Sequence, residues 1–154
     1  MSPTSPAPPR SRAQRRRDTE DRLVHDVDLW VASASADGGV HLVPLSFHWD
    51  GETLLLATPT ASRTARNLVA TGTVRLGLGD TRDVSLIDGD VEVLELGALP
   101  GERVELFVAH AGFDPRGLPE PYAWFRVTPR RVQAWREVDE LPDREIMRDG
   151  RWVV

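Results

Sequence analysis

The sequence predicts a mainly β fold, a small antiparallel barrel of six or seven strands with two short helices covering its ends. Short apolar and β-branched runs recur between turn signals such as Asp37-Gly38-Gly39 and Asp50-Gly51, which is typical of β-hairpins. The strands do not alternate with helices as they do in a parallel α/β fold. The nucleotide motif G-x-G-x-x-G and the P-loop are also absent, so a doubly wound nucleotide fold is not expected.

The elements follow in order from the same signals. Seven segments have strand patterns, at residues 29–36, 40–49, 52–58, 73–78, 84–96, 122–128 and 131–138, and a short apolar strand ends the chain. Helices are expected at residues 62–70 and 100–112, each stopped by a glycine, and a weaker helix pattern covers residues 18–27. The first three strands form an antiparallel meander.

Two prolines mark irregular places in these strands. Pro44 has no N–H to donate to a ladder, so it indicates an edge or a bulge in the strand at residues 40–49. Pro129 separates the segments at residues 122–128 and 131–138, which are therefore expected to be two strands. Bulged positions of this kind often lie beside ligands.

Residues 1–17 form a proline- and arginine-rich segment with no apolar residue beyond Met1 and alanines, so we expect it to be disordered. It holds five of the 19 arginines and no acidic residue, and the domain at residues 18–154 is therefore strongly acidic. A basic arm can contact nucleic acid, but an acidic domain behind it argues against nucleic acid as the main partner.

Composition excludes several classes of function. The chain has 154 residues, enough for one domain with a real core, and no cysteine, so thiolate metal sites and disulfides are impossible. The absence of cysteine suits a reducing cytoplasm. No apolar run approaches the length of a membrane span, and no secretory signal is expected. Lysine is absent as well, which excludes a lysine Schiff base.

The stretch from Thr53 to Leu68 is the best candidate for a binding site. A buried strand ending near Thr58 leads through a short loop into a helix that opens at Ser62. The first N–H groups of a helix have no helical partner, and together with the helix dipole they attract anions. Arg63 can add charge-assisted hydrogen bonds to a phosphate or carboxylate, with Thr64 beside it. The local chemistry therefore predicts that this corner holds the phosphate of a cofactor.

The histidines give a weaker signal. His41 and His48 lie seven residues apart on one strand, which places them on opposite faces, and no cysteine or nearby acidic ligand accompanies them, so no metal site is predicted. His41 could approach the rim of a cofactor site. His48 is expected at a surface or turn, and His25 and His110 on helix surfaces.

The order of these motifs resembles one family. A strand and a glycine turn precede V-P-L-S-F-H-W-D-G and L-L-L-A-T-P, and S-R-T-A-R-N-L follows. This arrangement is similar to the FMN-binding split barrel of the pyridoxamine 5'-phosphate oxidase-like superfamily, over residues 23–138. The C-terminal F-R-V-T-P-R-R-V-Q-A-W-R is similar to that family too. The resemblance implies a Greek-key split barrel that forms a homodimer, with flavin sites at the subunit interface.

The resemblance also implies residues for the site. In that family the phosphate lies where the third strand meets the helix, which corresponds here to Thr58, Ser62, Arg63, Thr64 and Asn67. The ring of the flavin lies along the second strand, here Pro44, Leu45 and Ser46. Aromatic and arginine side chains near the C-terminus reach the partner's flavin in that family, and the candidates by position are Trp124, Arg126 and Trp135. Many members carry lysine at the position of Thr64, so Arg63 and Arg66 must supply the charge in this chain.

Several functions remain open at this point. The leading hypothesis is an oxidoreductase that transfers hydride between FMN, or the deazaflavin F420, and a small organic substrate, because a flavin carries this chemistry itself. No general acid or base is assigned. A flavin-binding module without turnover is the second hypothesis, and a haem-binding relative, with His41 or His110 on the iron, is the third.

Overall fold

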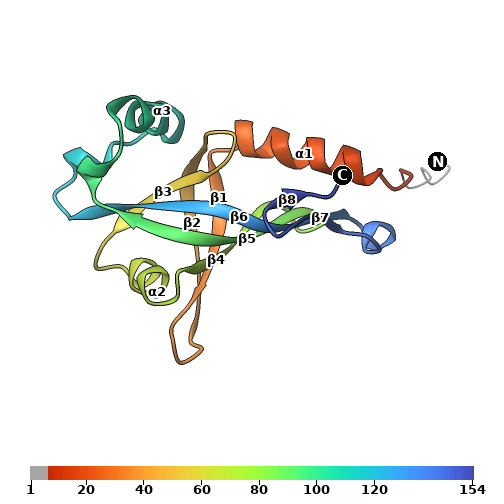
Figure 1. The fold of residues 1–154 in the computed structure, drawn as a ribbon, viewed down its shortest axis with the longest axis horizontal. Coiled ribbons are helices and arrows are strands. Elements are labelled where there is room, and N and C mark those ends of the chain that lie inside the picture. Colours follow the sequence, from red (N-terminus) through yellow and green to blue (C-terminus); the bar gives the residue numbers. More distant parts are fainter. Residues whose placement is uncertain (1–6) are drawn as a thin grey trace, which may run out of the picture.

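Six antiparallel strands close into a barrel within residues 7–154, the part of the chain that the computed structural model describes. The hydrogen-bonded order is β3-β2-β1-β4-β5-β6, and β6 pairs back onto β3 to close the ring. Two short strands extend the sheet beyond β6 (Figure 1). The strands are β1 (Asp28–Ala34), β2 (Val40–Trp49), β3 (Leu54–Pro59), β4 (Thr73–Asp80), β5 (Asp83–Leu94), β6 (Tyr122–Arg136), β7 (Glu145–Arg148) and β8 (Arg151–Trp152). The predicted mainly β fold class is confirmed.

Three α-helices pack around the barrel in the described part of the chain: α1 (Arg12–His25), α2 (Arg63–Thr71) and α3 (Gly101–Ala111). Three short 3-10 turns, η1 (Leu96–Ala98), η2 (Pro115–Gly117) and η3 (Val138–Glu140), complete the connections. Helices α2 and α3 correspond to the two clear helix predictions, and α1 includes residues 18–25 of the weaker helix pattern. Helices α2 and α3 lie at opposite sides of the barrel, whereas α1 runs alongside β7 and β8 (Figure 1).

The third strand is apolar at successive positions because it faces two cores. Leu54 and Leu56 point into the barrel, where α2 also contributes to the main core. Leu55 and Ala57 point outward into a second core, which α3 covers with Val104 and Phe107. A strand buried on both faces has no polar alternation, which explains the continuous Leu-Leu-Leu-Ala run.

The prediction of a disordered segment at residues 1–17 is wrong for residues 12–17, which form the first turns of α1; residues 1–6 lie outside the described part. Ser11 caps the helix by accepting the N–H of Gln14. Arg15 is buried, and its Nη1 donates to the carbonyls of Ala134 and Glu140 at 3.0 and 3.1 Å. The buried face of α1 therefore combines the long side chain of Arg15 with Thr19 and Leu23.

The two prolines have different outcomes. Pro44 pairs in register with Trp30 of β1, in a part of β2 that has no second neighbour strand, so the predicted edge is confirmed. Pro129 does not separate two strands, because β6 continues through it from Tyr122 to Arg136. A bulge opposite Gly89 accommodates the missing N–H donor of Pro129. A Cβ at Gly89 would lie 2.5 Å from Val127, so glycine is required there.

None of the helices within residues 7–154 has both the length and the apolar character needed to cross a membrane.

Candidate functional site: an arginine-lined cavity at the start of α2

The start of α2 has the geometry that the sequence predicts. Ser62 is the N-cap, and its Oγ accepts the N–H of Ala65 at 3.1 Å. The same hydroxyl lies 3.2 Å from Thr58 Oγ1, at the end of β3. The loop between them is held by hydrogen bonds from the N–H of Thr60 to the carbonyl of Pro121 and from the N–H of Ser62 to the carbonyl of Pro59. Strand and helix therefore meet in a rigid corner.

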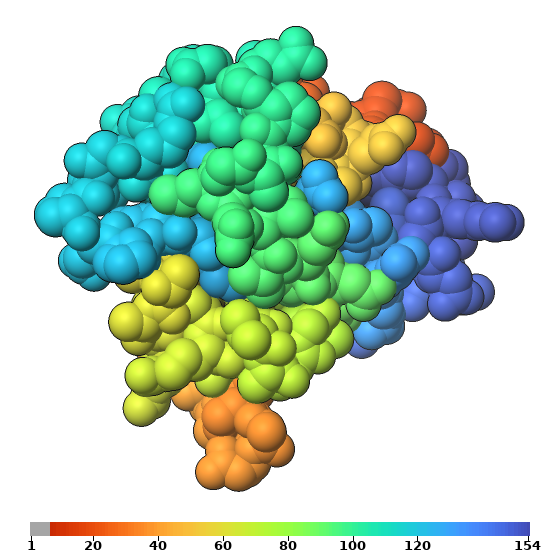
Figure 2. Space-filling view, turned by 60° about the vertical axis from the view of Figure 1, so that its left-hand side comes forward, coloured from red at the N-terminus to blue at the C-terminus, as the bar shows by residue number. Residues whose placement is uncertain are grey.

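A cavity of about 410 Å³ lies beside this corner, between α2 and the β1–β2 hairpin. Its lining residues are Ser35, Asp37, Gly39, Arg63, Arg66 and Asn67. In the space-filling view the hairpin tip, in orange, projects beyond α2 and β4 (Figure 2). Two guanidinium groups and one carboxylate give this cavity a net positive charge.

The two arginines of the cavity differ from nearly all others in the chain. The side chains of Arg63, Arg66 and Arg151 form no hydrogen bond or ion pair with any residue between 7 and 154. Each of the other arginines donates to a carboxylate, a carbonyl or another acceptor. Two cations that have no partner in the described part of the chain, three residues apart on one helix, fit an anionic ligand.

Asp37 faces the same cavity from the hairpin, and sequence analysis did not select it. Ser35 Oγ donates to its carboxylate, and this hydrogen bond is the main reason why the pKa of Asp37 is below its ordinary value. The carboxylate is therefore charged at neutral pH. The Asp37-Gly38-Gly39 turn was the only sequence signal for this residue, and it predicted a hairpin rather than a cavity wall.

Thr64 and Asn67 are buried rather than open to the cavity mouth. Thr64 is 2% exposed, so its hydroxyl does not replace the lysine that the family resemblance leads one to expect. Asn67 Nδ2 donates to Ser33 Oγ at 3.1 Å, which ties α2 to β1. The exposed charge on this helix comes from Arg63 and Arg66.

The predicted ring residues lie on β2, outside the arginine cavity. Pro44 is exposed and lines a separate cavity of about 410 Å³ with Trp30 and Gly77. Leu45 packs against the main core, and Ser46 Oγ donates to Asp28 at 2.6 Å. A single chain therefore does not unite the two halves of the predicted site in one cavity.

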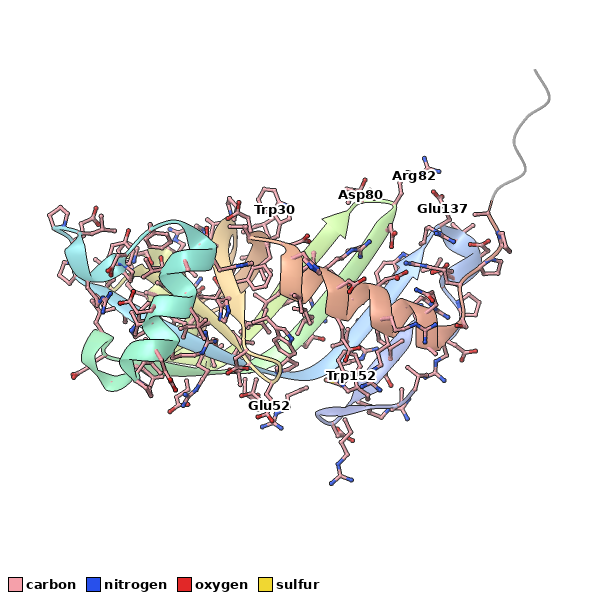
Figure 3. The ribbon with its side chains drawn as sticks, turned by 90° about the horizontal axis from the view of Figure 1, so that it is seen from above. Trp30, Glu52, Asp80, Arg82, Glu137 and Trp152 are labelled. Carbon is pink, nitrogen blue, oxygen red and sulfur yellow. The ribbon has the colours of Figure 1, made fainter. Side chains whose placement is uncertain are left out.

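The outer face of β1 and β2 carries exposed apolar side chains. Trp30 is 52% exposed, Leu42 60% and Val40 86%. Figure 3 shows Trp30 at the surface near the end of α1. A cavity of about 760 Å³ continues this face and includes His41. The alternation Leu29, Trp30, Val31 was the available signal, because a period of two places Trp30 opposite the core.

The C-terminal candidates Trp124 and Arg126 already interact with other residues of the chain. Trp124 is completely buried, and its ring packs 4.9 Å from Phe107 while Nε1 donates to the carbonyl of Leu96. In this structure the core location of Trp124 leaves no surface for a cofactor. Arg126 lies on the outer side of β6 and pairs with Glu92 at 2.7 Å. Neither side chain lies in the arginine cavity.

The positions of His48 and His110 differ from those that the sequence predicts. His48 and His110 are half-buried where α3 packs on β2, with ring centroids 5.5 Å apart, and not at a free surface or turn. His110 Nε2 contacts the carbonyl of Asp26 at 2.7 Å. No group of three or more potential metal-ligating side chains exists among residues 7–154.

Comparison with known proteins identifies the class. The family model described as pyridoxamine 5'-phosphate oxidase matches residues 28–136, which is most of the chain and includes β1 to β6. The protein therefore belongs to the pyridoxamine 5'-phosphate oxidase-like family, as the sequence motifs indicate. No curated protein gave a match.

Solved structures share the fold at low sequence identity. An F420 reductase is 22% identical, with a TM-score of 0.59 over 73% of this chain and 94% of that protein. The haem storage protein HutZ from Vibrio cholerae is 14% identical, with a TM-score of 0.63 over 81% and 98%. An FMN-binding protein from Nostoc punctiforme is 16% identical, with a TM-score of 0.51 over 80% and 78%. These likenesses establish the fold only.

Proposed function

We propose that this protein binds FMN, or the deazaflavin F420, as a homodimer and acts as an oxidoreductase on a small organic substrate in the cytoplasm. Family membership supports a flavin-type cofactor. The observation that carries the proposal is the pair of unpartnered guanidinium groups, Arg63 and Arg66, lining one cavity beside the N-terminus of α2. A phosphate there would meet fixed positive charge and the unpaired N–H groups of the helix start.

The chain's own residues would bind and orient the cofactor. Arg63 and Arg66 would hold the phosphate, and Ser62 and Thr58 would fix the helix start against β3. Pro44, Leu45 and Ser46 would line the ring. A bound flavin would supply the hydride chemistry, which is why no catalytic side chain is assigned.

A second copy of the chain is part of the proposal. The outer face of β1 and β2 exposes Trp30, Val40 and Leu42, and apolar patches of this kind mark interaction sites. The arginine cavity and the cavity beside Pro44 are separate in one chain, so a complete flavin site needs an additional wall. The partner subunit would provide that wall.

F420 is the alternative cofactor, supported by the fold shared with an F420 reductase. A haem-binding module is a weaker alternative, since HutZ shares the fold. His110 Nε2 contacts the carbonyl of Asp26, so His41, which lines the cavity of about 760 Å³, is the better candidate for iron. A flavin-binding protein without turnover is the remaining alternative.

The first experiment measures cofactor affinity with matched ligands. FMN and riboflavin have the same ring, but only FMN carries the phosphate. Arg63→Gln should weaken FMN binding by about 1.5–3 kcal/mol, the value of a charge-assisted hydrogen bond, and leave riboflavin binding unchanged. Arg66→Gln should have a smaller effect in the same direction. Arg151→Gln is the matched control, because Arg151 also has no partner but lies on β8.

Two results would count against the proposal. Equal losses for FMN and riboflavin would mean that Arg63 does not contact the phosphate, and no binding of FMN, F420 or haem to the wild-type protein would remove the cofactor assignment. Mass spectrometry of the small molecule released from denatured protein would separate FMN from F420 and haem. Turnover with a panel of electron acceptors would then distinguish an enzyme from a carrier.

A further inference from the structure

A cluster of polar side chains outside the proposed cofactor site joins α3 to β2. Arg103, in the first turn of α3, is largely buried, and its Nη1 donates to Nδ1 of His48. Its Nη2 donates to the carbonyl of His48 at 3.3 Å, and its Nε lies 3.6 Å from Asp50. His110, on the last turn of α3, packs edge-on against His48. One arginine therefore binds both the ring and the backbone of the same histidine.

This contact defines the protonation state of His48. A guanidinium group has donors only, so Nδ1 of His48 must accept, and the ring must be neutral with its proton on Nε2. Protonation would place a hydrogen on Nδ1, remove the acceptor and bring an imidazolium against the guanidinium. The His110 contact is different, because its Nε2 faces a carbonyl and can donate from either the neutral or the protonated ring.

We propose that the His48–Arg103 contact is an acid-sensitive latch that holds α3 on the barrel. With His48 neutral, α3 is fastened to β2 at its N-terminal turn. With His48 protonated, the hydrogen bond is lost and the two cations repel each other. Loosening of α3 would uncover the second core, in which Phe107 covers Leu55 and Trp124.

The charged groups around His48 agree with this direction. Burial, then the charge of Arg103 and then His110 lower the pKa of His48 below its ordinary value of 6.5, and Asp50 opposes them. Arg126 on β6 adds positive charge near Arg103. The strand neighbour of His48 is Leu55, which is apolar, and the carbonyl of Asp26, the C-cap residue of α1, contacts His110.

The sign of the pH effect follows from the lowered pKa. When α3 is released, His48 has its ordinary pKa. Below pH 6.5, His48 therefore binds a proton more readily in the released state than in the closed state. The latch is therefore fully closed above pH 6.5. It weakens as the pH falls, by about tenfold for each pH unit, until the pKa of the closed state is reached.

Two measurements on the intact protein test the latch. NMR titration of the His48 ring should give a pKa below 6.5, with Nδ1 unprotonated at neutral pH. Hydrogen exchange of the α3 amides, corrected for the intrinsic pH dependence, should show protection at pH 7.5 that falls at pH 5, by at most about 30-fold, because pH 5 lies 1.5 units below the ordinary pKa of His48. His48→Gln is the informative variant, because its amide oxygen can still accept from Arg103 and cannot titrate. Its α3 protection should not change with pH.

His25→Gln is the control, since His25 is exposed on α1 and its loss should leave the pH dependence of α3 unchanged. A wild-type α3 equally protected at pH 7.5 and pH 5 would overturn the proposal. So would a His48 pKa at or above 6.5, or a pH dependence that persists in His48→Gln. The titration of the wild-type ring decides the question even if the variant does not fold.

Discussion

Ser62 illustrates how one hydroxyl joins two elements at the candidate site. It accepts the N–H of Ala65, which caps α2, and lies within hydrogen-bond distance of Thr58 on β3. Arg63 and Arg66 extend from the same helix into the cavity. The position of the guanidinium groups therefore depends on a cap that itself carries no charge.

Ser62→Ala should lower the free energy of unfolding by about 1 kcal/mol, because the N–H of Ala65 loses its acceptor. Denaturant unfolding monitored by circular dichroism measures this change. Ser62→Asp separates stability from binding, since aspartate also caps a helix but places a negative charge beside the proposed phosphate. We expect near wild-type stability and weaker FMN binding for Ser62→Asp, and equal FMN affinity would contradict the proposed location.

At the scale of elements, α1 is held by a buried carboxylate. The Glu140 side chain is inaccessible to solvent and accepts from the backbone N–H groups of Arg10 and Arg136 at 2.9 Å each. Arg10 also reaches Asp18 and Asp83, so it connects α1, β5 and η3. On the other side of α1, Arg16 stacks 4.7 Å from the ring of Trp152, which Figure 3 shows beside the helix.

Arg10→Ala should destabilise the protein by about 3 kcal/mol, because it leaves the Glu140 carboxylate buried with fewer partners. Chemical denaturation measures the loss. Arg17→Ala is the matched control in the same segment, since Arg17 is exposed and contacts only Gln14. That change should stay within about 0.5 kcal/mol of wild type. Equal effects of the two substitutions would mean that the basic segment is a solvated tail.

The lowered pKa of Glu140 indicates that the free energy of unfolding depends on pH in acid. Burial alone would raise its pKa, but hydrogen bonds from the Arg10 side chain and from the Arg10 and Arg136 N–H groups outweigh burial and lower the pKa to about 2. The lowered pKa contributes stability that is complete above the ordinary value of 4.5 and is lost as the pH falls toward 2. The loss is at most about 3 kcal/mol. The free energy of unfolding of Glu140→Gln should be lower at neutral pH and should vary less between pH 4.5 and 2.

At the scale of the whole molecule, the apolar outer face of β1 and β2 has no cover within residues 7–154. Trp30 and Leu42 lie on this face, together with the half-buried Ala32. The same face borders the cavity beside Pro44. Dimerisation and cofactor binding would therefore depend on one surface.

Leu42→Arg should convert the proposed dimer to a monomer, because an arginine at the centre of an apolar interface is costly to desolvate. Sedimentation velocity measures the oligomeric state, and FMN affinity should fall in parallel. Leu106→Arg is the control, since Leu106 is also exposed but lies on α3. A wild-type protein that sediments as a monomer would contradict the dimer part of the proposal and leave the arginine cavity as an independent prediction.

The amino-acid sequence alone determined the strand pattern, the two hairpin turns, the cap at Ser62 and the family motifs. These features depend on residues a few positions apart, through the period of two in strands and the capping rules of helices. They were sufficient to predict the barrel and the strand-to-helix corner at the start of α2.

Only the tertiary structure decided which arginines are free and which are engaged. Arg10 pairs with a carboxylate 130 residues away, and Arg103 with a histidine 55 residues away, whereas Arg63 and Arg66 have no such partner in the described chain. All of them look alike in the sequence. Closure of the barrel brings segments together that are distant in the sequence. The low polarity of the surroundings at these contacts, rather than local propensity, determines which partner each charged side chain takes.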